Sequence, residues 1–144
     1  MYDEKTDLYE MQAENNVKNY NFITAYKSMF LKYSEFSGRS RRSEYWYAYL
    51  ANYILIIAFV ILSALFSFSE ALATVMAVLC MLYTFVIIIP ALALTVRRLH
   101  DTGRSAWWLL IALVPYIGEL VLLIFTLLDS QPGTNKYGKN PKGE

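Results

Sequence analysis

The sequence has little of what most catalytic and metal sites are built from. Cys80 is the only cysteine among 144 residues, and His100 is the only histidine. One cysteine excludes a disulfide framework, and this cysteine–histidine count excludes a zinc site of the usual spacing. Cys80 lies in an apolar run, where we expect it to behave as a small hydrophobic residue. No nucleophile pattern of a serine or cysteine enzyme accompanies His100, so we expect no cofactor, no metal and no catalytic site.

Charged residues are missing from two long stretches, and this absence is typical of a membrane protein. Residues 45–69 and 71–96 contain no Asp, Glu, Lys or Arg. About 20 such residues suffice to cross the hydrocarbon core of a bilayer, which is about 30 Å thick. We therefore predict two transmembrane helices. Because the connection at 66–70 is very short, these helices must be antiparallel neighbours.

A third apolar block, residues 106–128, contains Pro115 and Gly118 near its centre. The length of the block suffices for one crossing and favours a single kinked span. The alternative is a re-entrant hairpin that turns back at the Pro and Gly. The single span would export residues 129–144, whereas the hairpin would keep the lysines of this polar tail inside. Glu119 would be an ionisable group within the membrane, which is costly there, so we expect it to face protein or water.

The N-terminal part is polar at first and then amphipathic. Residues 1–20 are expected to form a mobile polar tail. Apolar side chains in residues 21–35 recur at helical spacing behind a suitable N-cap, Asn21, and predict an amphipathic helix. This helix would lie at the membrane interface or pack on the protein's own loops. A transmembrane domain, residues 36–128, and a polar tail, residues 129–144, complete the expected organisation.

Two basic clusters flank the predicted spans. Since the spans are antiparallel neighbours, both clusters lie on one side, which the positive-inside rule makes cytoplasmic, together with the N-terminus. Arginine donates in a planar, bidentate geometry that suits phosphate groups. We therefore treat the clusters as candidate contacts for anionic headgroups, with a pure topology signal as the alternative. The candidate residues are Arg39, Arg41, Arg42, Arg97, Arg98, His100 and Arg104.

Two further features concern the polar loop after the second predicted span. Arg97 and Asp101 are four residues apart, a spacing that predicts an ion pair shaping the loop. His100 and Asp101 are neighbours, which do not face each other on a helix, so a catalytic pair is not expected.

Aromatic residues at the ends of the apolar runs are expected to anchor the protein at the membrane interface. These anchors are Tyr45, Trp46, Trp107 and Trp108.

Four motifs between residues 36 and 141 resemble a known family. They read Phe36-x-Gly38-Arg39-x-x-Arg42-x-Glu44-Tyr45-Trp46, Arg97-Arg98-Leu99-His100-Asp101-Thr102-Gly103-Arg104-Ser105-x-Trp107-Trp108, Pro115-x-x-Gly118 and Gly133-x-Asn135-x-Tyr137-Gly138-x-x-Pro141. The family is a group of small bacterial inner-membrane proteins called domain of unknown function 805. Glu119 departs from its pattern, in which an apolar or aromatic residue follows the glycine. The resemblance implies a bacterial inner-membrane protein with several spans, and it implies no activity.

Together these features predict an all-α integral membrane protein. It has two antiparallel transmembrane helices and a third, Pro/Gly-broken apolar helix, preceded by an amphipathic helix. The sparse polar content of the spans favours a non-enzymatic scaffold or accessory subunit with an arginine-rich cytoplasmic face. The alternative is a component of lipid or small-solute transport. Expected partners are the bilayer, its anionic lipids, and a membrane protein or second copy. The net charge of +1 argues against nucleic acid.

Overall fold

The computed structural model describes residues 21–143, which form helices, the loops that connect them and one isolated bridge. The predicted tail at residues 1–20 lies outside the described residues. The elements are α2 (Phe22–Leu31), α3 (Arg42–Leu65), α4 (Glu70–Asp101), a 3-10 helix η1 (Ala106–Leu113) and α5 (Ile117–Leu127). The all-α fold class is confirmed.

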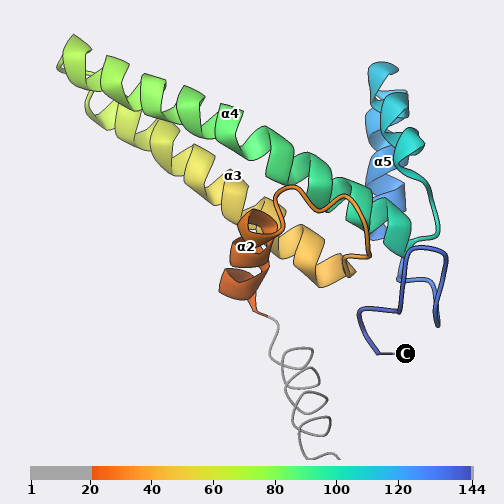
Figure 1. Ribbon diagram of the computed structural model, residues 1–144. Coiled ribbons are helices and arrows are strands. Elements are labelled where there is room, and N and C mark those ends of the chain that lie inside the picture. Colours follow the sequence, from red (N-terminus) through yellow and green to blue (C-terminus); the bar gives the residue numbers. More distant parts are fainter. Residues whose placement is uncertain (1–20, 144) are drawn as a thin grey trace, which may run out of the picture.

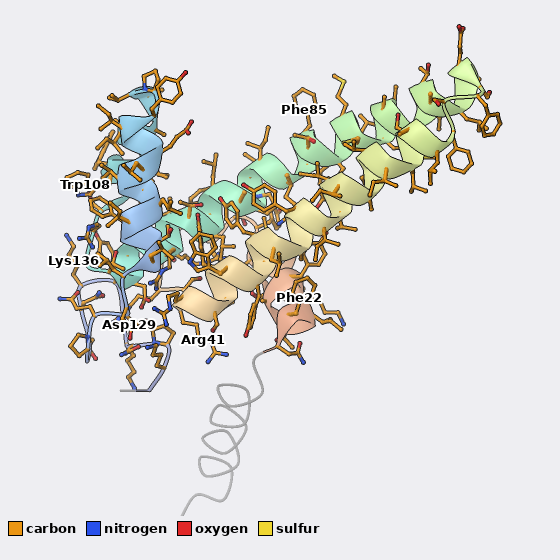
Figure 2. All side chains as sticks on the ribbon, turned by 180° about the vertical axis from the view of Figure 1, so that it is seen from behind. Phe22, Arg41, Phe85, Trp108, Asp129 and Lys136 are labelled. Atoms are coloured by element: carbon orange, nitrogen blue, oxygen red, sulfur yellow. The ribbon has the colours of Figure 1, made fainter. Side chains whose placement is uncertain are left out.

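The helices α3 and α4 form a long antiparallel pair (Figure 1). Both are long and apolar enough to cross a membrane. Only 17% of the most apolar stretch of α3 and 6% of that of α4 is buried, whereas the core helix of a soluble protein is mostly covered. Large apolar side chains such as Val60 and Phe85 point outward, and Figure 2 shows Phe85 projecting from α4. The prediction of two antiparallel helices of spanning length is confirmed.

The helix α2 packs across the α3/α4 pair. Asn21 begins it with a reciprocal cap: its side chain accepts from the Thr24 N–H at 3.0 Å, and its own N–H donates to Thr24 Oγ1 at 2.9 Å. Ala25 and Met29, one turn apart, are fully buried, and Met29 shares a core cluster with Ala48 of α3. The helix ends at Leu31 and is shorter than the predicted range, because the chain turns there toward the C-terminal end of α4.

The third apolar block folds as a hairpin of η1 and α5. At its tip the Ile117 N–H donates to the Pro115 carbonyl at 2.7 Å, which closes a three-residue γ-turn. Its central residue, Tyr116, has φ +63° and ψ −52°, a conformation that is rare and strained for an L-residue. The two helices then approach so closely that a Cβ on Gly118 would lie 1.7 Å from the Ile111 carbonyl oxygen. Only glycine fits at this contact.

This hairpin decides between the two alternatives left by the sequence. After α5, the Gln131 N–H donates to the Asp101 carbonyl at 2.9 Å, so the tail returns to the end of α4. The single span that the block length favoured is therefore wrong for the described residues. The reason is the turn at Tyr116, which reverses the chain after a 3-10 helix of only eight residues.

The two hairpins share one end and diverge from it (Figure 1). We call this shared end the base. It contains the segment at residues 32–41, the last turn of α4, and the C-terminal loop at residues 129–143. Figure 2 shows Arg41, Asp129 and Lys136 at this end of the molecule. All basic residues proposed from the sequence thus gather at the base or next to it.

Candidate functional site

Asp101 is the centre of the polar network in the base. Its Oδ1 accepts from Arg39 Nε at 2.9 Å, and its Oδ2 accepts from Arg98 Nη1 and from Ser130 Oγ, the latter at 2.6 Å. The side chains of Arg39, Arg98 and Asp101 are at most 1% exposed. We call these three residues the clamp. A buried ion group of this kind is stable only when its remaining donors are also satisfied.

The remaining donors of Arg39 are held by the C-terminal loop. Nη1 donates to the carbonyl oxygens of Gly133 at 2.8 Å and Gly138 at 3.2 Å, and Nη2 donates to that of Gln131 at 2.5 Å. A planar fork with five N–H groups can reach all these oxygens together with Asp101, which a lysine ammonium cannot. Arg39 therefore fixes the loop to the rest of the base.

Arg98 holds the end of α5. Its Nε donates to the Thr126 carbonyl at 3.2 Å, and its Nη2 donates to the Leu128 carbonyl. The last carbonyls of a helix lack partners within the helix, and a cation there also offsets the helix dipole. Its Nη1 also reaches the Ser40 carbonyl at 3.2 Å, so Arg98 joins three chain segments.

Arg97 does not form the predicted ion pair with Asp101. It donates instead to the carbonyls of Lys32 and Glu35, both at 2.7 Å, and to Ser40 Oγ at 3.2 Å. Successive residues on a helix point about 100° apart, so Arg97 faces the turn after α2 while Arg98 faces Asp101. The partners of Asp101 are thus Arg98, three residues away, and Arg39, which is distant in sequence.

His100 is a packing residue between two segments of the base. Its ring is stacked on the Tyr137 ring, with centroids 3.7 Å apart and planes 4° from parallel. Its Nδ1 lies 3.2 Å from the Gly38 carbonyl oxygen, and its own carbonyl accepts from Asn135 Nδ2 at 2.9 Å. These contacts involve one face of the ring, its Nδ1 edge and the backbone carbonyl, and the residue is 7% exposed.

Three of the predicted arginines lie further out. Arg42 is exposed and reaches the Leu127 carbonyl at 3.4 Å, and Arg41 is half-buried beside it. The Arg104 guanidinium lies 3.9 Å from the centroid of the Phe125 ring, in a cation–π contact. We call Arg41, Arg42 and Arg104 the outer arginines. Unlike the clamp, they retain surface at the rim of the base.

The predicted interface anchors fall into two groups. Tyr45 is 7% exposed, and Trp46 is half-buried with its indole N–H donating to the Thr126 carbonyl at 3.2 Å, so both residues are engaged within the protein. Trp107 is 78% exposed, and Trp108 is partly exposed with its ring edge-on to Phe125. Only the second pair has the exposure that an interface anchor needs.

A cleft of about 460 Å³ lies between the two hairpins above the base. One face of α5 contributes Glu119 to it, at the far end of the helix from the clamp. The Tyr49 hydroxyl in its wall is hydrogen-bonded to Thr95 Oγ1 at 3.0 Å. The lining residues are Tyr45, Trp46, Tyr49, Tyr53, Leu92, Thr95, Leu109, Glu119, Leu122, Leu123 and Thr126.

Sequence reasoning missed the role of the C-terminal loop. Its contacts to Arg39 use backbone carbonyls, which carry no side-chain signal. The one available signal was the Gly133–Gly138 motif, since positive φ angles at both glycines shape the loop that presents these carbonyls. The ion pair between Arg39 and Asp101 could not be predicted either, because the two residues are 62 positions apart and give no local pattern.

The comparisons with known proteins place the clamp and both hairpins inside one family. A family model described as "Protein of unknown function (DUF805)" matches residues 33–139. The inner membrane protein YhaI of Escherichia coli K12 is 42% identical over 117 residues, covering 81% of this chain and 94% of YhaI. The inner membrane protein YhaH of the same organism is 37% identical over 119 residues, covering 83% and 97%. No solved structure matches. From the extent of these matches, the chain belongs to the DUF805 family.

Proposed function

We propose that this protein is a non-enzymatic scaffold or accessory subunit of the bacterial inner membrane. Two relatives carry the name inner membrane protein, and the exposed apolar surfaces of α3 and α4 suit lipid or another membrane protein. The clamp is the observation that carries the proposal. Its three charged side chains are almost fully buried and bind one another and backbone carbonyls. This polar cluster therefore joins segments and offers no reactive group to a substrate.

In the proposed orientation the base lies in the cytoplasm, as does the N-terminus, and both hairpins enter the bilayer from it. The helix α5 has 11 residues and is about 16 Å long, roughly half the hydrocarbon thickness. The hairpin of η1 and α5 is then a re-entrant element, with Trp107 and Trp108 at headgroup depth. The Arg-rich base on the cytoplasmic side satisfies the positive-inside rule.

Cysteine labelling tests this orientation. A cysteine at Thr102, in a background with Cys80→Ser, should resist a membrane-impermeant maleimide in intact cells and react in inverted membrane vesicles. Thr102 is half-buried in the loop after α4, so the vesicle experiment also controls for access. Reaction from outside intact cells would reverse the orientation and remove the basis for the cytoplasmic base.

Within this proposal, the outer arginines contact anionic headgroups. The donors of Arg39 and Arg98 are used inside the protein, so a direct headgroup contact falls to the residues at the rim. Each cation close to an anionic leaflet contributes roughly 1 kcal/mol, or about fivefold in affinity. Arg42 and Arg104, which contact Leu127 and Phe125 of α5, suit a paired test.

Lipid analysis of purified protein tests the headgroup contact. The double variant Arg42→Gln/Arg104→Gln should retain several-fold less phosphatidylglycerol relative to phosphatidylethanolamine than the wild type. The matched variant Arg42→Lys/Arg104→Lys keeps the charge and should retain most of the lipid, because the rim lacks a buried bidentate site. An unchanged lipid ratio in the Gln variant would contradict the headgroup role.

A component of lipid or small-solute transport is the second candidate, and the cleft between the hairpins favours it. Its volume is within the range of small-molecule sites. Co-purification separates the two candidates. A stoichiometric membrane-protein partner, or a stable second copy, supports the scaffold, whereas bound lipid or solute without a protein partner supports transport.

A further inference from the structure

The cleft between the hairpins has one charged residue and one aromatic wall. On α5, Glu119, Leu122, Leu123 and Thr126 recur at spacings of three and four residues and so line it from one helical face. On α3, the wall is a ladder of tyrosines at four-residue spacing. The ring centroids of Tyr45 and Tyr49 are 4.5 Å apart, and those of Tyr49 and Tyr53 are 6.5 Å apart. Glu119 is the only formally charged residue among the lining residues.

The carboxylate and the end of the tyrosine ladder are about equally far from the floor of the cleft, each along its own helix. The hydrogen bond from Trp46 to the Thr126 carbonyl joins α3 and α5 at the floor of the cleft. Glu119 lies seven residues before Thr126, and Tyr53 lies seven residues after Trp46. At 1.5 Å per helical residue, each is about 10 Å from the floor along its own helix. Glu119 and Tyr53 therefore line the outer part of the cleft, on the two helices that diverge from its floor.

The Glu119 carboxylate has no cation opposite it in this part of the molecule. Among residues 21–143 the acids in ion pairs are Asp101 and Asp129, and the basic clusters lie at the base. A carboxylate in an apolar cleft is costly unless an opposite charge approaches it. A cation that entered between Glu119 and Tyr53 would offset that cost and would also meet the electron-rich face of an aromatic ring.

We propose that this cleft binds a lipophilic organic cation of small-molecule size. The apolar walls take the hydrophobic body of the ligand, Glu119 takes its charge, and Tyr53 contributes a cation–π contact. The volume of about 460 Å³ holds a small molecule, which selects this ligand class over a whole partner helix. This site is separate from the headgroup contact at the rim, so each proposal can fail without the other.

Titration with tetraphenylphosphonium tests the site. The full chain in phosphatidylcholine nanodiscs should bind this cation saturably, after subtraction of binding to empty nanodiscs. Glu119→Gln, which keeps the shape of the side chain, should weaken binding by roughly tenfold or more, because it removes the only formal charge among the residues that line the cleft. Tyr53→Leu should weaken binding by about two- to fivefold. Glu70→Gln, at the far end of α4, is the matched control and should bind as the wild type does.

Two further measurements keep the test decisive. Tetraphenylborate has nearly the same size and the opposite charge, so it should not bind saturably. Leu122→Trp fills the cleft while leaving the carboxylate in place, and it should abolish binding of the cation. Equal affinity in the wild type and in Glu119→Gln, or saturable binding of the borate, would overturn the proposal. So would a photo-cross-linker at position 122 that captures a polypeptide in native membranes while the protein binds no cation, since the cleft would then belong to a partner helix.

Discussion

Replacing Asp101 by asparagine removes the carboxylate of the clamp and keeps its shape. Both guanidiniums that bind it, from Arg39 and Arg98, stay buried after the change. Breaking a buried ion pair by removing one partner costs about 3–5 kcal/mol, because the remaining charge is left uncompensated. We expect a loss near the lower end of this range for Asp101→Asn, about 3 kcal/mol, since the amide oxygen still accepts one of the hydrogen bonds and the arginines keep their carbonyl partners.

Thermal unfolding in detergent measures this loss. Cys80, within α4, is the natural reporter, because it reacts with a thiol dye as the helices separate. It lies about 30 Å along the helix from Asp101, so the substitution does not change its surroundings directly. A loss of about 3 kcal/mol lowers the midpoint of unfolding by roughly 10 °C in a domain of this size. The loop should also detach locally, so trypsin should cleave after Lys136 and Lys139 at least tenfold faster.

Asp129→Asn is the matched control. Lys142 donates to the Asp129 carboxylate at 2.5 Å, and this hydrogen bond lowers the pKa of the carboxyl group. The Asp129 side chain is 61% exposed, however, and an exposed ion pair contributes only about 0–1 kcal/mol. The control should melt within about 3 °C of the wild type. If Asp101→Asn melted like this control and its loop stayed resistant to trypsin, the clamp would not stabilise the base.

The other predictions concern the hairpin and the fork of Arg39. Gly118→Ala places a methyl group against the Ile111 backbone, which cannot move aside, so this variant should lose several kcal/mol of stability and unfold well below the wild type in the same thiol assay. Tyr116→Gly relieves a positive φ and should raise the unfolding midpoint by a few degrees, for a gain of about 1 kcal/mol; a lower midpoint would show that the Tyr116 conformation is not strained. Arg39→Lys keeps the charge but not the fork, so tryptic release of the loop should increase, and unchanged release would refute the role of the fork.

Local and compositional signals explain what could be predicted from the sequence. The absence of charge over residues 45–69 and 71–96 predicted two helices of spanning length, since a bilayer constrains length and polarity directly. The short connection then required the two arginine clusters to meet, and the base does bring them together. Asn21 was likewise correct as a cap, because capping depends on residues within one turn.

Predictions that depended on a choice of partner or direction were less accurate. Asp101 has a possible partner at both three and four residues' distance, and only the packing of α2 decides that Arg97 turns away. The length of the third apolar block favoured one span, whereas a single γ-turn at Tyr116 reverses the chain. Tyr45 and Trp46 have the composition of interface anchors, but Tyr45 is buried in the core cluster with Met29, and Trp46 is hydrogen-bonded to the returning α5.

The closure of Arg39 by the C-terminal loop has a consequence for the order in which the protein is made. Its partner carbonyl at Gln131 is synthesised 92 residues after Arg39. At 5–20 residues per second, the delay is about 5–18 s. Throughout that interval Arg39 has no loop to enclose it and keeps its hydration, so in the proposed orientation it can act as a cytoplasmic retention signal while α3 and α4 insert. Once the C-terminal loop has been made, the same guanidinium binds its carbonyl oxygens and holds the loop in place. The charge is thus available as a retention signal first and is used as an internal contact afterwards, although a buried arginine could not serve both purposes at once.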